Sequence, residues 1–171
     1  MLDKCLRRGA LGYDLRADLL EVLLQAGANP NTKSDEGIAP LQSAARSIHP
    51  THEDGNAEIK RAIALLIKNG AKLDLFSAVA IGDEAEVKRL LVANPKIVNA
   101  LGPDGYPALH FAVGMDYRNI VAMLLQAGAD VNIRNESKHT GDFGETALEC
   151  AHFWNRDELI KVLEAAGGRR K

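Results

Sequence analysis

The sequence predicts an all-α solenoid of about five short helix pairs, because two phrases recur along its 171 residues. Repetition with a period of about 20 to 50 residues is typical of such folds. The first phrase is LLQAGANPN at 23–31, LLIKNGAKLD at 65–74, LLVANPKIVN at 90–99 and LLQAGADVN at 124–132. The second phrase is GIAPLQSAA at 37–45, GYPALHFAV at 105–113 and GETALECA at 144–151, with a shortened copy, LFSAVA, at 75–80.

The leucines of the second phrase set the period. They are Leu41, Leu75, Leu109 and Leu148, so successive copies lie 34, 34 and 39 residues apart. A single short helix pair cannot bury its apolar face alone, whereas stacked pairs share one continuous core. We therefore expect a single domain over residues 1–171. Its repeats are expected near 1–31, 32–74, 75–99, 100–133 and 134–171.

Each repeat is expected to hold two antiparallel helices joined by a turn. In the fourth repeat the first helix is predicted near 108–114, where apolar residues recur at i, i+3 and i+4. The second is predicted near 117–127, and Gly128 supplies the left-handed residue that ends it. Leu66 and Leu124 take the same apolar position in their repeats, so both are expected to be buried.

The repeats depart from one another at four places. Ten extra residues near 47–56 are expected to lie between the helices of repeat two. Nine residues are missing after Asp74, so one hairpin finger should be absent there. The last finger, near 133–143, is six residues longer than usual and should project. The first helix of repeat one is reduced to residues 2–6, so this repeat is expected to act as a cap.

Both phrases are similar to those of a known family. APL at 39–41, ALH at 108–110 and TAL at 146–148 each match part of a T-P-L-H opening, and the closing phrase reads L-L-x-x-G-A-x-x-N. In these features residues 15–168 resemble ankyrin repeats, whose unit is about 33 residues long. The resemblance implies helix pairs with short hairpin fingers and a concave groove for a protein partner. It also implies that His110 ties its own turn by hydrogen bonds.

The resemblance places the fingertips and the residues after each opening phrase in that groove. Five of the eight aromatic residues map there, and aromatic, Met and Arg side chains are enriched at interface centres. Trp154 is expected either to be an exposed anchor or to pack under Phe143. The acidic finger residues are either turn formers or contacts for a basic partner. The candidate partner-binding residues are Arg46, Tyr106, Met115, Tyr117, Phe143, Phe153, Trp154 and Arg156.

Composition excludes several classes of function. The net charge of −2 offers no basic footprint for nucleic acid. No run of about 18 apolar residues predicts a membrane span. The two cysteines lie at opposite ends of the sequence, which is typical of a reducing compartment. We therefore expect a cytoplasmic protein that is a monomer when free and binds neither nucleic acid nor a membrane.

No catalytic signature is present, so the sequence predicts a non-catalytic binding module with no cofactor and no metal. It leaves open whether the module is an adaptor or an inhibitor or immunity-type protein. One alternative is a metal-dependent or enzymatic protein that uses the loop inserted in repeat two, where His49, His52, Glu53 and Asp54 cluster. The other alternative is a regulatory ankyrin segment of a larger protein.

Overall fold

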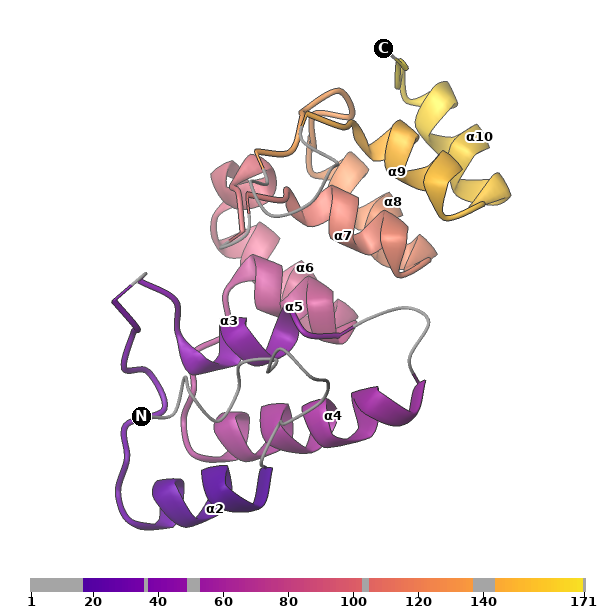
Figure 1. The fold of residues 1–171 in the computed structure, drawn as a ribbon. Helices are drawn as coiled ribbons and strands as arrows, with labels where there is room; N and C mark the ends of the chain where they lie inside the picture. Colours follow the sequence, from indigo (N-terminus) through magenta and orange to yellow (C-terminus); the bar gives the residue numbers. More distant parts are fainter. Residues whose placement is uncertain (1–16, 36, 49–52, 103–104, 137–143, 171) are drawn as a thin grey trace. The chain divides into compact units, whose positions relative to one another are not determined.

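The computed structural model describes residues 17–35, 37–48, 53–102, 105–136 and 144–170 (Figure 1). Within these ranges the chain is helical, and its only extended pairings are two isolated bridges, Leu101 with Pro107 and Arg134 with Thr146. This confirms the all-α class. The helices are α2 (Ala17–Gln25), α3 (Pro40–Ala45), α4 (Glu53–Lys68), α5 (Leu75–Ile81), α6 (Glu84–Ala93), the 3-10 helix η1 (Pro95–Asn99), α7 (Ala108–Gly114), α8 (Arg118–Gln126), α9 (Ala147–Phe153) and α10 (Asp157–Ala165).

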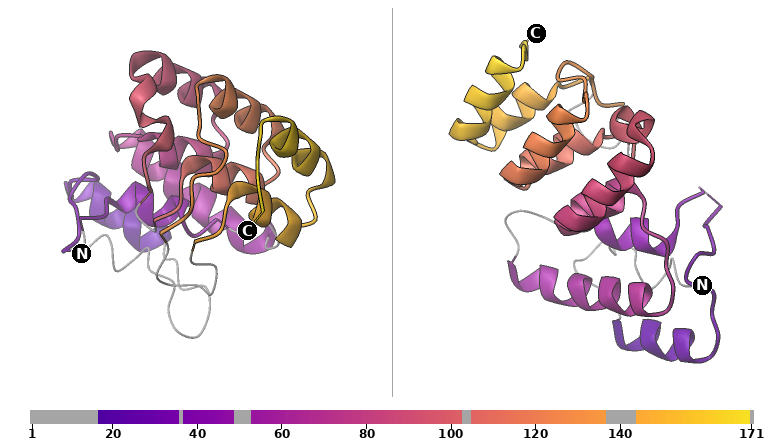
Figure 2. Two further views of the ribbon diagram at one scale, coloured as in Figure 1. Left: turned by 90° about the horizontal axis from the view of Figure 1, so that it is seen from above. Right: turned by 180° about the vertical axis from the view of Figure 1, so that it is seen from behind.

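The chain divides into two compact units, residues 1–73 and 74–171. In the first unit α4 packs against both α2 and α3. In the second unit the helices form three pairs, α5 with α6, α7 with α8, and α9 with α10. The first helices of these pairs lie in a row, because α7 contacts α5 on one side and α9 on the other (Figure 2).

The buried side chains follow the predicted apolar positions. Leu66 and Leu124 are both fully buried, as expected. The helices of the fourth repeat, Ala108–Gly114 and Arg118–Gln126, begin and end within a residue of the predicted bounds. Gly128 follows with a φ of 88° and ends the second of them as predicted, because glycine adopts this left-handed conformation without a steric penalty.

The junction between repeats two and three has no finger, as the sequence predicts. Residues 69–74 are all described and form no hairpin. Asp74 is the N-cap of α5, and its carboxylate accepts a hydrogen bond from the Ser77 N–H at 2.7 Å. A side-chain oxygen at this position satisfies one of the free N–H groups at a helix start. The residue that closes one repeat therefore begins the next.

In other repeats the closing residue is an asparagine that binds the main chain of the following repeat. Asn31 donates from Nδ2 to the Gly70 carbonyl at 2.9 Å and accepts from the Lys72 N–H at 2.9 Å. Asn132 makes the same two bonds, to the Gly167 carbonyl at 3.1 Å and from the Arg169 N–H at 2.8 Å. These amide pairs hold each repeat end in register with the next.

The insertion in repeat two differs from its prediction. Helix α4 has 16 residues, whereas the equivalent α6 and α8 have 10 and 9. Part of the insertion therefore lengthens the second helix instead of lying between the helices. Glu53 and Asp54 belong to α4 and not to a loop, because acidic residues are favourable at the positive end of a helix. His49 and His52 lie outside the described residues.

Candidate functional site

The turns between paired helices in the second unit share one backbone conformation. Gly82, Asp116 and Asn155 each lie seven residues after an opening leucine and have φ values of 76°, 57° and 53°. Among residues with a side chain, Asp and Asn adopt this left-handed region most readily. The three turns thus repeat the same geometry. We call the surface formed by residues 81–84, 114–120 and 153–157 the turn face.

The residue after each left-handed position is the N-cap of the second helix. Asp83 caps α6 by accepting from the Glu86 N–H at 3.0 Å. Tyr117 and Arg156 take the equivalent positions without making a side-chain cap bond within the described chain. Both side chains reach back to the preceding repeat instead.

Tyr117 and Arg156 therefore brace neighbouring repeats. A Cβ atom placed on Gly82 would lie 3.2 Å from the Tyr117 ring, so the ring packs closely over that glycine. Arg156 donates from Nη2 to the carbonyl of Gly114 at 2.8 Å. Both side chains are half-buried as a result. Burial also raises the pKa of the Tyr117 hydroxyl, because it penalises the phenolate.

Phe153 and Trp154 form an edge-to-face aromatic pair with their ring centroids 5.1 Å apart. Trp154 is half-buried, and its Nε1 would lie 3.5 Å from a Cβ placed on Gly114. It is thus less exposed than the anchor interpretation expects, and the alternative, packing under Phe143, involves a residue outside the described ones. Phe153 is the exposed member of the pair, with 71% of its surface accessible.

The structure gathers some of the predicted site residues and separates others. Met115 follows α7 and is half-buried, so the residues brought together on the turn face are Met115, Tyr117, Phe153, Trp154 and Arg156. Tyr106 precedes α7 and stacks edge-on against His110, with the ring centroids 6.4 Å apart. Seven helical residues span about 10 Å, so Tyr106 lies at the other end of that helix. Arg46 is the half-buried C-cap of α3 in the first unit, and Phe143 lies outside the described residues.

His110 ties two repeats together and not its own turn, so that expectation was wrong. The imidazole is fully buried, and Nε2 lies 2.9 Å from the carbonyl oxygen of Glu145 in the next repeat. Because a carbonyl only accepts, the proton of neutral His110 is on Nε2. The residue before α7 is Pro107, whose side chain has no hydrogen-bonding group to hold the ring within its own turn.

The burial of His110 makes folding stability depend on pH. Burial lowers its pKa below the usual histidine value, against smaller opposing effects of the Glu145 carbonyl and the Glu149 charge. The unfolded chain therefore binds this proton more readily, so stability is expected to fall as pH drops below about 6.5. Urea unfolding at about pH 5 and about pH 7.5 should show this loss, and His110→Gln should reduce it. An identical pH dependence in His110→Gln would contradict the assignment.

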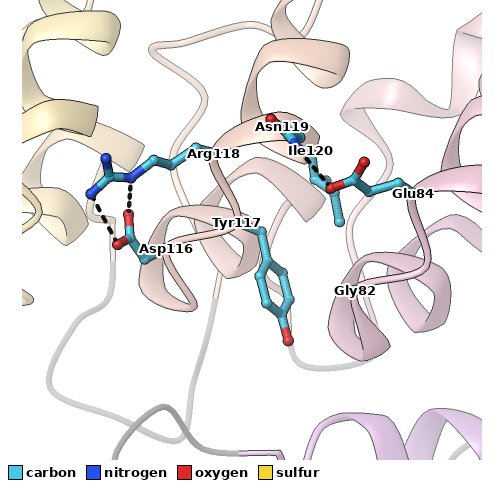
Figure 3. A pocket seen from close by; sticks show the side chains of 7 residues that line it. All are labelled: Gly82, Glu84, Asp116, Tyr117, Arg118, Asn119 and Ile120. Atoms are coloured by element: carbon cyan, nitrogen blue, oxygen red, sulfur yellow. Dashed lines mark hydrogen bonds and ion pairs between the residues drawn. The ribbon is translucent and has the colours of Figure 1, made fainter.

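A pocket of about 330 Å³ opens between the first two turns of the second unit (Figure 3). Asn119 donates from Nδ2 to a carboxylate oxygen of Glu84 at 2.9 Å, and Arg118 pairs with Asp116 at 3.2 Å. The lining residues are Gly82, Glu84, Asp116, Tyr117, Arg118, Asn119 and Ile120. Sequence reasoning missed Glu84 and Asn119. Aligning the repeats could have pointed to Glu84, because the alignment puts Glu84, Arg118 and Asp157 at the first position of their helices.

Two further features bear on what the described residues can do. They contain no group of three or more His, Cys, Asp or Glu side chains that could hold a metal ion. None of their helices is long and apolar enough to cross a membrane.

Comparison with known proteins gives one family and several relatives. A family model described as "Ankyrin repeats (3 copies)" matches residues 75–168.

The NAD-capped RNA hydrolase NUDT12 of Homo sapiens is 32% identical over 94 residues, which cover 55% of this chain and 19% of that protein. The E3 ubiquitin-protein ligase XBAT33 of Arabidopsis thaliana is 38% identical over 91 residues, covering 52% and 16%. The SH3 and multiple ankyrin repeat domains protein 2 of Homo sapiens is 24% identical over 171 residues, covering 95% and 8%. The chain thus spans less than a fifth of the length of these relatives.

Proposed function

This chain belongs to the ankyrin-repeat family, and from that premise we propose that it binds a protein partner, without catalysis, through the turn face of its second unit. Ankyrin repeats generally mediate protein–protein interaction. What supports this surface in particular is a single observation, the exposure of Phe153.

Phe153 occupies a position that is small and buried elsewhere in the unit. Five residues after the opening leucine, repeats three and four have Ala80 and Gly114, both buried. At Gly114 the next repeat packs directly on the backbone through Trp154. Within the described residues no following repeat covers Phe153, and the position carries a large aromatic side chain that leaves 71% of its surface in water. Large exposed aromatic side chains of this kind are typical binding anchors.

The surroundings of Phe153 also support a preformed binding surface. Its ring is held edge-on by Trp154, and Trp154 is itself fixed against Gly114. The Arg156 bond to the Gly114 carbonyl holds the same turn in place. An anchor that is already ordered loses little conformational entropy when a partner binds.

The test is a quantitative capture experiment on lysate of the cells that produce the protein, with mass spectrometry of what is retained. Phe153→Ser is expected to weaken capture of the partner by at least about 2 kcal/mol, or roughly 30-fold. Its folding stability should fall by no more than about 1.5 kcal/mol, because the side chain is mostly exposed and its main packing contact is the edge-on pair with Trp154.

Val92→Ser is the matched control, since Val92 on α6 is 76% exposed and lies outside the turn face. It should capture the partner as well as the unmodified protein does. Equal losses in the two variants would point to nonspecific apolar adsorption, and unchanged capture by Phe153→Ser would remove the turn face as the binding surface.

A second candidate function is the same binding role inside a longer protein. The relatives favour it, because the matching segment makes up only a small part of each of them. The adaptor and inhibitor roles, the cytoplasmic location and the monomeric free state remain predictions. The lack of binding to nucleic acid or membranes is likewise a prediction.

A further inference from the structure

We propose that the pocket between the first two turns of the second unit receives a basic side chain of the protein partner, with arginine as the best fit. This inference rests on the proposed function, because it assigns the partner's chemistry at the same turn face. The pocket volume of about 330 Å³ lies near the lower end of the range for ligand sites, about 300–1,000 Å³. It suits one inserted side chain better than a large cofactor.

The lining of the pocket includes an aromatic ring. The ring of Tyr117 is held in place over Gly82, and the buried side chain of Ile120 lies on the same lining (Figure 3). A planar guanidinium stacks on such a ring by cation–π attraction, and its aliphatic stem packs on apolar surface. The ring is thus ordered before any partner arrives.

The charge that selects a cation comes from Glu84. One carboxylate oxygen accepts from Asn119, and within the described residues Glu84 forms no ion pair. Asp116, the other carboxylate of the lining, is already paired with Arg118 through two contacts at 3.2 and 3.4 Å. The uncompensated negative charge of the pocket therefore belongs to Glu84.

Arg118 is the one cation among the described residues that line the pocket, and its position leaves the pocket open to another. Its guanidinium turns toward Asp116, on the opposite side of Tyr117 from Glu84 (Figure 3). The negative charge of Glu158 in α10 also acts on Arg118. Arg118 therefore neutralises other carboxylates, and Glu84 is left as the partner for an incoming cation.

The pocket is continuous with the aromatic part of the turn face. Asp116 and Tyr117 line it, and Gly114, two residues before Asp116, carries the Trp154 indole. A partner segment that covers Phe153 therefore has only the 114–120 turn between it and the pocket. The complementary segment of the partner has an apolar residue that covers Phe153 and a basic residue close to it. Glu84 and Tyr117 bind the basic residue.

The test uses isotope-labelled full chain and a small probe, N-acetyl-arginine amide, followed by NMR. We expect saturable shifts of the Asn119 side-chain amide and of the backbone amides at 116–120. N-acetyl-citrulline amide, a neutral isostere of the probe, should leave these signals unmoved. N-acetyl-lysine amide should bind more weakly, because its ammonium cannot stack as a plane.

Two variants complete the design. Glu84→Gln should weaken the arginine probe about 2- to 5-fold, the size expected for one exposed ion pair. Asp157→Asn is the matched control, because Asp157 starts α10 as Glu84 starts α6 but does not line the pocket. It should bind the probe as the unmodified protein does, and the amide spectra of both variants report whether the fold is kept.

Each contrary result overturns the inference. Shifts that are equal for the arginine and citrulline probes, or absent at tens of millimolar arginine probe, exclude a cation site. An unchanged affinity in Glu84→Gln, or an equal loss in Asp157→Asn, excludes recognition by Glu84. Lysine binding as tight as arginine overturns the assignment of arginine. None of these outcomes depends on partner capture through Phe153, so failure of the pocket and failure of the proposed function are separable.

Discussion

Leu124→Ala is expected to lower the free energy of unfolding by about 2–5 kcal/mol. Leu124 is fully buried in α8, a helix that packs against both α6 and α7. Removing the isobutyl group loses its burial energy and leaves a cavity that rigid neighbouring helices cannot fill. Leu66 takes the same position in α4, which packs against α2 and α3, so the same change there should cost a similar amount.

Urea unfolding followed by circular dichroism measures both variants. Val92→Ala removes apolar atoms from a side chain that is 76% exposed, so it should change stability by no more than about 0.5 kcal/mol. Because each repeat is stabilised by its neighbours, the loss at Leu124 should also reduce amide protection in adjacent helices. A loss below about 1 kcal/mol at both leucines would contradict their place in the core.

Gly102→Ala is expected to cost about 1–3 kcal/mol, because one added methyl group would overlap a packed ring. A Cβ at this position would lie 2.4 Å from Cδ2 of Phe76. Phe76 is buried and packs edge-on against Phe111 with the centroids 5.3 Å apart, so its ring cannot move aside freely. Gly102 does not have a positive φ, so the backbone itself tolerates alanine and the effect is steric.

A double-mutant cycle with Phe76→Leu separates this clash from other causes. In the Phe76→Leu background, Gly102→Ala should cost less than it does in the unmodified protein, because the smaller side chain leaves room for the methyl group. Denaturation midpoints of the four proteins measure the coupling. The same cost in both backgrounds would show that the ring is not what opposes the substitution.

Periodicity predicted the helices well where each repeat is regular. The apolar spacing in the fourth repeat placed its first helix at Ala108–Gly114, as the structure has it. The absence of a finger after Asp74 could also be predicted, because the deletion leaves no residues that could form one. Both features depend on local sequence and on the count of residues between repeats, which a sequence states directly.

Features that depend on contacts between repeats were not predictable in this way. The sequence marks His110 as a conspicuous residue, but its bond to the Glu145 carbonyl joins residues 35 positions apart. Some of the inserted residues of repeat two extend helix α4. This was not predictable, because helix propensity alone does not place the boundary between an inserted loop and the helix after it. Phe153 and Trp154 are adjacent in the sequence, which does not say which of them is exposed. The structure does, because Trp154 packs on Gly114 and Phe153 does not.

The asparagine bonds between repeats depend on the main chain of the following repeat. Asn31 and Asn132 recognise only carbonyl and N–H groups of the following repeat, which every residue but proline supplies. These particular bonds therefore do not depend on which side chains the bonded residues carry. Asp74 is the exception, because its carboxylate serves the start of its own helix. The asparagine bonds thus constrain the main chain of the following repeat, whereas the Asp74 bond constrains the start of a helix.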